Sequence, residues 1–182
     1  TAGRPSAQAT AAERFWPQWR GPGASGVSRV ANPPVEWSES KNIRWRIDLP
    51  GRGSATPVVW GDRLFVLTAV PVGVPGDAQH APRGGLKPRG MHRFIVLAID
   101  RATGKTVWRV NRPTNARFES PDAYTTPALL KYGNATEVVI TCGDVVTGHD
   151  PASGKELWRA DGLYPRYDGR YRIVASPVIH GG

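Results

Sequence analysis

The chain has 182 residues, 40% of them hydrophobic, and contains 21 Gly, 17 Pro and a single Cys. Glycine and proline between short apolar runs favour an all-β protein over a helical one. One cysteine excludes an internal disulfide, and no apolar run reaches the roughly 18 residues that a membrane-spanning helix needs. The net charge of +9 favours acidic partners, although a basic surface can also serve solubility alone.

The beginning of the chain holds a short motif that, together with the family resemblance given below, predicts export. Residues 1–14 are small and polar, which predicts a disordered linker, and Ala7-Gln8-Ala9 within them fits a signal-peptide cleavage site. Residues 15–40 are rich in Trp, Pro and Gly without strand alternation, so they predict an irregular strap. We expect three tryptophans to anchor this strap by packing: Trp16, Trp19 and Trp37.

From residue 41 onward, short apolar strands alternate with turn residues. Residues 42–49 predict an outer strand, and residues 56–69 predict a hairpin that turns at Gly61-Asp62. Residues 71–93 hold four Pro and five Gly, which indicates an inserted surface loop. Three further strand pairs are predicted, at residues 94–110, at residues 125–141 with a turn at Gly133-Asn134, and at residues 145–159.

The chain repeats one stretch of sequence. Residues 97–108, LAIDRATGKTVW, return as residues 147–158, TGHDPASGKELW, so that the landmark residues of the two copies lie 50 positions apart. Such a fixed period is typical of stacked copies of one structural unit. The landmarks are Asp100, Gly104, Lys105 and Trp108 in the first copy, and Asp150, Gly154, Lys155 and Trp158 in the second.

Each copy predicts a hairpin that ends on a tryptophan. The Asp side chain can accept hydrogen bonds from backbone N–H groups two or three residues on, and the Gly can adopt positive φ. Burying a Trp side chain of roughly 200 Å² at about 25 cal/mol per Å² contributes several kcal/mol, enough to dock one strand pair on its neighbour. Trp45 begins an earlier, partial copy, and every copy leads to a Ser/Thr-Pro strand start: Thr56-Pro57, Thr126-Pro127 and Ser176-Pro177.

These motifs carry a family resemblance. The DxxTGKxxW pattern after an apolar strand, the later TP or SP strand and the opening residues 15–22, FWPQWRGP, resemble exported proteins with pyrroloquinoline-quinone-type (PQQ-like) β-propeller repeats. That superfamily holds quinoprotein dehydrogenases and non-enzymatic relatives, including the propeller lipoprotein of the outer-membrane assembly complex. The resemblance spans residues 15–182. It implies a propeller of four-stranded blades with tryptophan-docking motifs, of which residues 41–182 hold an N-terminal part of about three blades.

Common active-site patterns are missing from the sequence. Gly104-Lys105-Thr106 ends like a phosphate-binding loop, but Ile99 stands where that loop needs its first glycine. No G-x-S-x-G nucleophile motif is present, and the four histidines are too scattered to bind zinc, so we expect no metal site from them. We expect His149 to be a partly buried strand residue with a backbone partner, and Cys142 to be a small core residue.

The resemblance implies where a cofactor would bind. In quinoprotein dehydrogenases the quinone and a calcium ion lie on the ring axis, held by loops that lead into the inner strands; here these are residues 50–56, 112–126 and 163–176. Arg and Asp in them could bind a tricarboxylate quinone and its cation, and the alternative is a set of solvated loops between blades. The ligand-facing candidates are Arg52, Arg117, Glu119, Asp122, Tyr124, Tyr167, Asp168 and Arg170.

Three functions follow from the repeats, the loops and the resemblance. The leading one is a non-catalytic propeller, a periplasmic or extracellular scaffold that binds proteins or a ligand, since the repeat motif accounts for most of the chain. The first alternative is a dehydrogenase that uses pyrroloquinoline quinone and calcium to oxidise an alcohol or sugar. The second is a binding module for anionic polymers, suggested by the interleaved Tyr and Arg of residues 164–172. Nucleic acid is not an expected partner, and the oligomeric state stays open.

Overall fold

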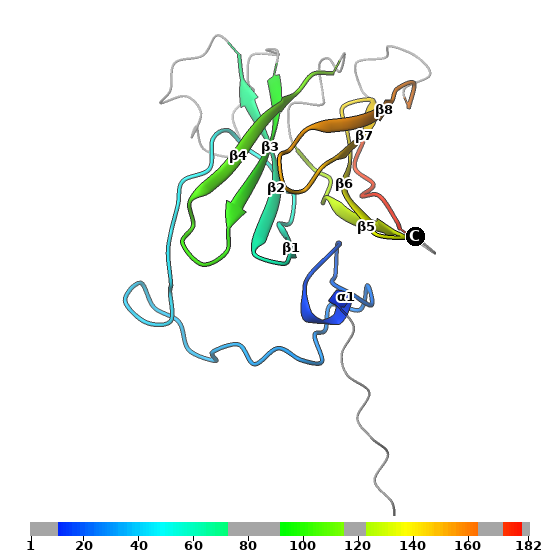
Figure 1. Cartoon of the computed structure of the whole chain (residues 1–182). Coiled ribbons are helices and arrows are strands. Elements are labelled where there is room, and N and C mark those ends of the chain that lie inside the picture. The colour runs from blue at the N-terminus through cyan, green and yellow to red at the C-terminus, as the bar shows by residue number, and fades with distance from the viewer. Residues whose placement is uncertain (1–10, 73–91, 115–122, 164–172, 180–182) are drawn as a thin grey trace, which may run out of the picture.

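The computed structural model describes residues 11–72, 92–114, 123–163 and 173–179. Within these ranges the chain is nearly all β, with eight strands in two four-stranded antiparallel sheets and one short helix (Figure 1). The first sheet contains β1 (Val58–Trp60), β2 (Arg63–Pro71), β3 (His92–Asp100) and β4 (Thr106–Arg112), and the second contains β5 (Ala128–Tyr132), β6 (Ala135–Cys142), β7 (Val145–His149) and β8 (Glu156–Ala160).

Both sheets have the form of a propeller blade. The strands follow one another in chain order within each sheet, which makes each sheet a four-stranded meander. The predicted all-β fold is therefore confirmed, with two complete sheets described rather than about three blades. The third strand start, Ser176-Pro177, is described, but residues 173–179 contain no strand.

Tight turns at glycine connect the strands where the sequence predicts them. β1 and β2 meet at Gly61-Asp62, and β5 and β6 meet at Gly133-Asn134. Both glycines have positive φ, 61° and 53°, a conformation that other residues rarely adopt. Gly143 and Asp144 connect β6 to β7 with φ of 60° and 79°, the pattern of a type I′ hairpin turn.

β2 and β3 are buried on both faces, which explains their nearly continuous apolar sequences. Alternate residues such as Phe65 and Val96 face the second sheet and share one core with Val138 and Ile140 of β6. The intervening residues form a second cluster on the opposite face of the first sheet: Val66, Ile95, Leu97 and Ile99. The first sheet is therefore the central layer of the described structure.

The N-terminal segment bridges the two sheets. Residues 1–10 of the predicted linker lie outside the described residues, and α1 (Ala11–Arg14) forms a single helical turn. Trp16 exchanges two backbone hydrogen bonds with Val59 of β1 (3.0 and 2.8 Å), and the N–H of Leu129 in β5 donates to Pro17 O (2.9 Å). Because β1 and β5 are the first strands of their sheets, these bonds cover otherwise unpaired edges.

The rest of the strap lies on the surface. From α1 it passes below the two sheets and then rises beside β4 (Figure 1). Trp19 and Trp37 are 56% and 64% exposed. The expectation that Trp19 and Trp37 anchor the strap is wrong for the described structure, because both residues are exposed there, whereas Trp16 is anchored through its backbone. No helix in the described ranges is long and apolar enough to cross a membrane.

The predicted outer strand at residues 42–49 is also wrong in the described structure. These residues form no strand, because no other described strand lies beside them to complete a hydrogen-bonded ladder. They cross the outer face of the first sheet instead, where Trp45 and Ile47 pack on the second apolar cluster. The inserted loop predicted at residues 71–93 falls mostly outside the described residues, between the ends of β2 and β3.

Candidate functional site

Two of the repeated tryptophans join one repeat to the next. Trp45 Nε1 donates to the carbonyl oxygen of Arg101 (3.0 Å), in the turn between β3 and β4. Trp108 Nε1 donates in the same way to Pro151 O (3.0 Å), in the turn between β7 and β8. Each tryptophan therefore docks on the Asp-to-Lys turn of the following repeat.

The glycine of each turn makes this docking possible. Gly104 and Gly154 have φ of 73° and 75°. A Cβ atom on Gly104 would lie 2.7 Å from the Trp45 ring, and one on Gly154 would lie 2.7 Å from the Trp108 ring. Both the backbone conformation and the space therefore require glycine.

The aspartates hold the turns in shape. Asp100 Oδ1 accepts from the Thr103 hydroxyl (2.7 Å) and from the backbone N–H groups of Thr103 (2.8 Å) and Ala102 (3.1 Å). Asp150 Oδ1 accepts from the hydroxyl and the N–H of Ser153, both at 2.7 Å. These hydrogen bonds, the hydroxyl first, lower the pKa of both carboxyl groups. Lys105 and Lys155 take part through their backbone carbonyls, which accept from Asp100 N and Asp150 N.

The third tryptophan behaves differently. Trp158 remains 38% exposed, and its Nε1 donates to Glu137 Oε2 (2.5 Å) of its own sheet. Tyr132 donates to the other carboxylate oxygen of Glu137 (2.7 Å). Gly148 gives the ring its room, since a Cβ there would lie 2.2 Å from Trp158 Nε1. In the described residues Trp158 therefore packs within its own blade.

A fully buried arginine joins the two sheets. Arg112, at the end of β4, has no exposed surface. Its Nε donates to Thr147 Oγ1 (2.7 Å), and its two terminal nitrogens donate to three backbone carbonyls of the β6–β7 hairpin. Burial lowers the pKa of Arg112 to about 10, which still leaves the side chain charged at neutral pH. The guanidinium therefore fastens the first sheet to the second.

The Ser/Thr-Pro motifs link the loops that precede the first strands. Thr56 N donates to Thr126 Oγ1 (3.2 Å), and Thr126 N donates to Ser176 Oγ (2.9 Å), so the same bond recurs one repeat later. Beside it, Ser54 N donates to Ala123 O (2.8 Å). These bonds explain why a hydroxyl residue precedes the second and third of these prolines.

The predicted ligand-facing residues are partly described. Arg52 and Tyr124 lie on the two loops that these hydrogen bonds bring together, and both take part in contacts of their own. The others lie outside the described residues: Arg117, Glu119, Asp122, Tyr167, Asp168 and Arg170. The two described candidates offer a guanidinium and a phenol but no carboxylate, so by themselves they do not fit a calcium ion. No group of three or more His, Cys, Asp or Glu side chains gathers within the described ranges.

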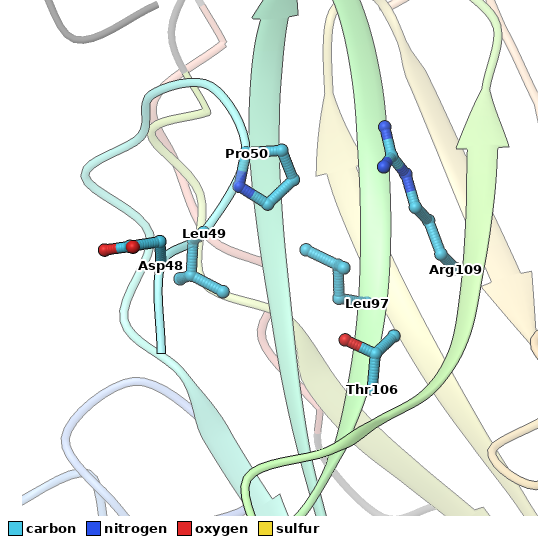
Figure 2. A pocket seen from close by; sticks show the side chains of 6 residues that line it. All are labelled: Asp48, Leu49, Pro50, Leu97, Thr106 and Arg109. Carbon is cyan, nitrogen blue, oxygen red and sulfur yellow. The ribbon is translucent and has the colours of Figure 1, made fainter. Parts of the chain in front are cut away.

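A cavity of about 500 Å³ lies where residues 48–50 cross the first sheet. Figure 2 shows Leu49, Pro50 and Leu97 around it, with Arg109 on β4 at one side. The second repeat has Glu156 at the position of Thr106, and there Arg159 pairs with Glu156 (2.7 Å) and donates to Pro113 O (2.7 Å). In the part of the chain that the structure describes, Arg109 has no such partner. Asp48 and Thr106 complete the lining.

The repeats match a known protein family. A family model described as outer membrane protein assembly factor BamB matches residues 29–182. The chain belongs to this family. The BamB-type match covers both sheets, the tryptophan-docking turns and the third Ser/Thr-Pro motif. None of the curated proteins compared with the chain matches it.

Sequence reasoning missed one important polar group of this BamB-type chain, Arg112. The residue follows Trp108-Arg109-Val110-Asn111 and resembles an exposed strand end. The available signal is the comparison of copies, since Leu49 stands at the same place, four residues after Trp45. A charged residue that replaces an apolar one at a repeat position indicates a changed interface.

Proposed function

We propose that the protein is a non-catalytic propeller that is exported and serves as a scaffold for binding other proteins. The matching family model is described as an outer membrane protein assembly factor, and this description supports a role in protein assembly. Export to the periplasm belongs to the same proposal and is tested by fractionating cells that produce the full-length protein.

The observation that carries the proposal is the use of the repeated side chains. Trp45 and Trp108 donate across repeats, Asp100 and Asp150 shape the turns that receive them, and hydroxyl groups of the Ser/Thr-Pro motifs link the loops. These repeated polar groups therefore have a structural task in the described residues. Such an arrangement makes a rigid platform, and rigid repeat platforms present extended surfaces to partners.

Cross-linking in cells and a quinone titration together test this proposal. We expect cross-linking of the full-length protein to recover components of the outer-membrane assembly machinery. We expect no saturable change in tryptophan fluorescence when pyrroloquinoline quinone and calcium are added to the purified protein. Saturable quenching at micromolar quinone or below would instead support a quinone-dependent enzyme.

One observation favours that second candidate, a quinone-dependent dehydrogenase. The backbone bond from Ser54 to Ala123 brings the loops of Arg52 and Tyr124 together, at the position where the family resemblance implies an axial ligand. Arg52 could bind a carboxylate of the quinone. If saturable quenching is seen, the Arg52→Ala variant should weaken it. The Arg109→Ala variant, whose substitution lies on β4, should leave the quenching unchanged.

A further inference from the structure

A chain of buried polar groups crosses the interface between the two sheets. Arg112 of β4 donates from Nε to Thr147 Oγ1 (2.7 Å), and Thr147 Oγ1 lies 2.9 Å from Nε2 of His149 in β7. The other ring nitrogen, Nδ1, lies 3.1 Å from Gly154 O in the turn that receives Trp108. All three side chains are at most 1% exposed. This chain of hydrogen bonds thus connects the buried arginine to the tryptophan-docking turn.

The direction of every hydrogen bond in this chain is fixed by its ends. Gly154 O can only accept, so His149 Nδ1 must carry a hydrogen. Arg112 Nε can only donate, so the oxygen of Thr147 is its acceptor. In a neutral ring with its hydrogen on Nδ1, Nε2 has a free lone pair and accepts from the Thr147 hydroxyl. The geometry therefore assigns the hydrogen of the neutral imidazole to Nδ1.

Adding a proton to His149 is incompatible with these hydrogen-bond directions. A protonated Nε2 becomes a donor and faces the Thr147 hydroxyl, whose hydrogen must then turn away into a buried site. The new cation would also lie one hydroxyl group from the guanidinium of Arg112. The loss of Nε2 as the acceptor of the Thr147 hydroxyl and the presence of a second buried cation both disfavour the docked arrangement.

The charged groups around the ring do not compensate for this cost. Arg112 on β4 and Arg159 on β8 oppose a proton on His149, while Glu156 on β8 favours one. The carboxylate of Glu156 is already engaged by Arg159 through two bonds of 2.7 Å. On β6 the thiol of Cys142 is neutral in this pH range, because burial raises its pKa to about 11. Asp144, in the β6–β7 turn, acts on Arg112 and Arg159.

We propose that His149 makes the docking of the two sheets sensitive to acid: the interface is held together while the imidazole is neutral, and it weakens when the ring takes up a proton. The first sheet offers a comparison within the same chain, because Ile99 occupies the equivalent position of the first repeat and cannot titrate. The device therefore belongs to the second repeat alone among the two described sheets.

The sign of the pH effect follows from burial. Burial is the largest cause that lowers the pKa of His149 below its ordinary 6.5. The unfolded chain then takes up the proton at a higher pH than the folded one, so stability is complete above pH 6.5 and decreases as the pH falls toward the folded-state value. Within that window the unfolding equilibrium constant rises by up to about tenfold per pH unit.

Urea unfolding of the protein between pH 8 and pH 5 tests the proposal. We expect the unfolding equilibrium constant of the wild type to rise several-fold between about pH 7 and pH 5. For the His149→Gln variant we expect a much smaller rise, because glutamine can donate and accept hydrogen bonds but cannot titrate. The matched control is His92→Gln, at the start of β3, which takes no part in the three hydrogen bonds described above and should keep the wild-type pH dependence. Equal pH dependence in His149→Gln and wild type would overturn the proposal.

A second measurement uses the wild-type protein alone and therefore does not depend on whether a variant folds. Nitrogen chemical shifts of the wild-type ring at pH 7.5 should show the Nδ1–H form, and the Nε–H resonance of Arg112 should persist there and weaken as His149 titrates. An Nε2–H form at pH 7.5, or an Arg112 resonance that is unchanged while the ring titrates, would contradict the proposed chain of hydrogen bonds.

Discussion

The two interfaces of the first sheet use the same repeat positions with opposite chemistry. On its outer face the first sheet presents Leu97 and Ile99 and meets Leu49, which stands four residues after Trp45. On the inner side, the second sheet presents Thr147 and His149 and meets Arg112, four residues after Trp108.

The difference shows which part of the repeat docks and which part adapts. The tryptophan, its glycine turn and the aspartate are the same in both interfaces, with docking bonds of 3.0 Å in each. The residues beside them differ: all three are apolar in the first interface, and all three are polar in the second. In the second interface a hairpin with a tight Gly143-Asp144 turn leaves three carbonyl groups for Arg112, whereas in the first sheet β2 and β3 continue as a longer ladder. The arginine therefore matches the short hairpin.

The largest expected effect comes from removing this arginine. Arg112→Ala leaves Thr147 and three buried carbonyl groups without their donor and opens a cavity, which we expect to cost about 3–5 kcal/mol of unfolding free energy. The matched variant Leu49→Ala removes a side chain that is already 36% exposed, and we expect a cost of about 1 kcal/mol. Urea unfolding at pH 7.5 measures both. A cost for Arg112→Ala no larger than that for Leu49→Ala would contradict the role assigned to the guanidinium.

The shared part of the two interfaces can be tested at its glycines. Gly154→Ala places a methyl group against the Trp108 ring at positive φ, and we expect a loss of about 3 kcal/mol. Gly133→Ala is the matched control, because its φ is also positive but nothing lies within 4 Å of the added atom. There we expect about 1–2 kcal/mol from the backbone alone. Equal losses for the two variants would mean that close packing of the tryptophan does not require the glycine.

Local patterns made most of the fold predictable. The turns at Gly61-Asp62 and Gly133-Asn134 depend on two or three neighbouring residues, and the sequence places them correctly. The aspartate turns and the buried His149 with its backbone partner are likewise found, because a 50-residue period aligns them with a second copy. Patterns of this kind need no knowledge of distant contacts.

Contacts between distant segments were the part that the sequence could not supply. Three of the four acceptors of Arg112 are backbone carbonyls about 30 positions away, and every residue type carries a carbonyl. Residue type alone predicts that Trp19 and Trp37 are anchors, but both are exposed in the described structure. Residues 42–49 have strand composition, yet they form no strand without a neighbour in the described structure.

The smallest expected effect concerns the charge of the docking turn. Asp150 accepts two hydrogen bonds from Ser153, and they lower the pKa of its carboxyl group below 3.8. Its contribution is complete above pH 3.8 and is lost as the pH falls through the lower folded-state value. Since the turn is at the surface, we expect Asp150→Asn to cost less than about 1 kcal/mol at pH 7. Thermal unfolding from pH 7 to pH 3 should show this cost shrinking as wild type becomes protonated, and Asp100→Asn should follow the same course. A cost that stays constant down to pH 3 would show that the amide disturbs the shape of the turn rather than its charge.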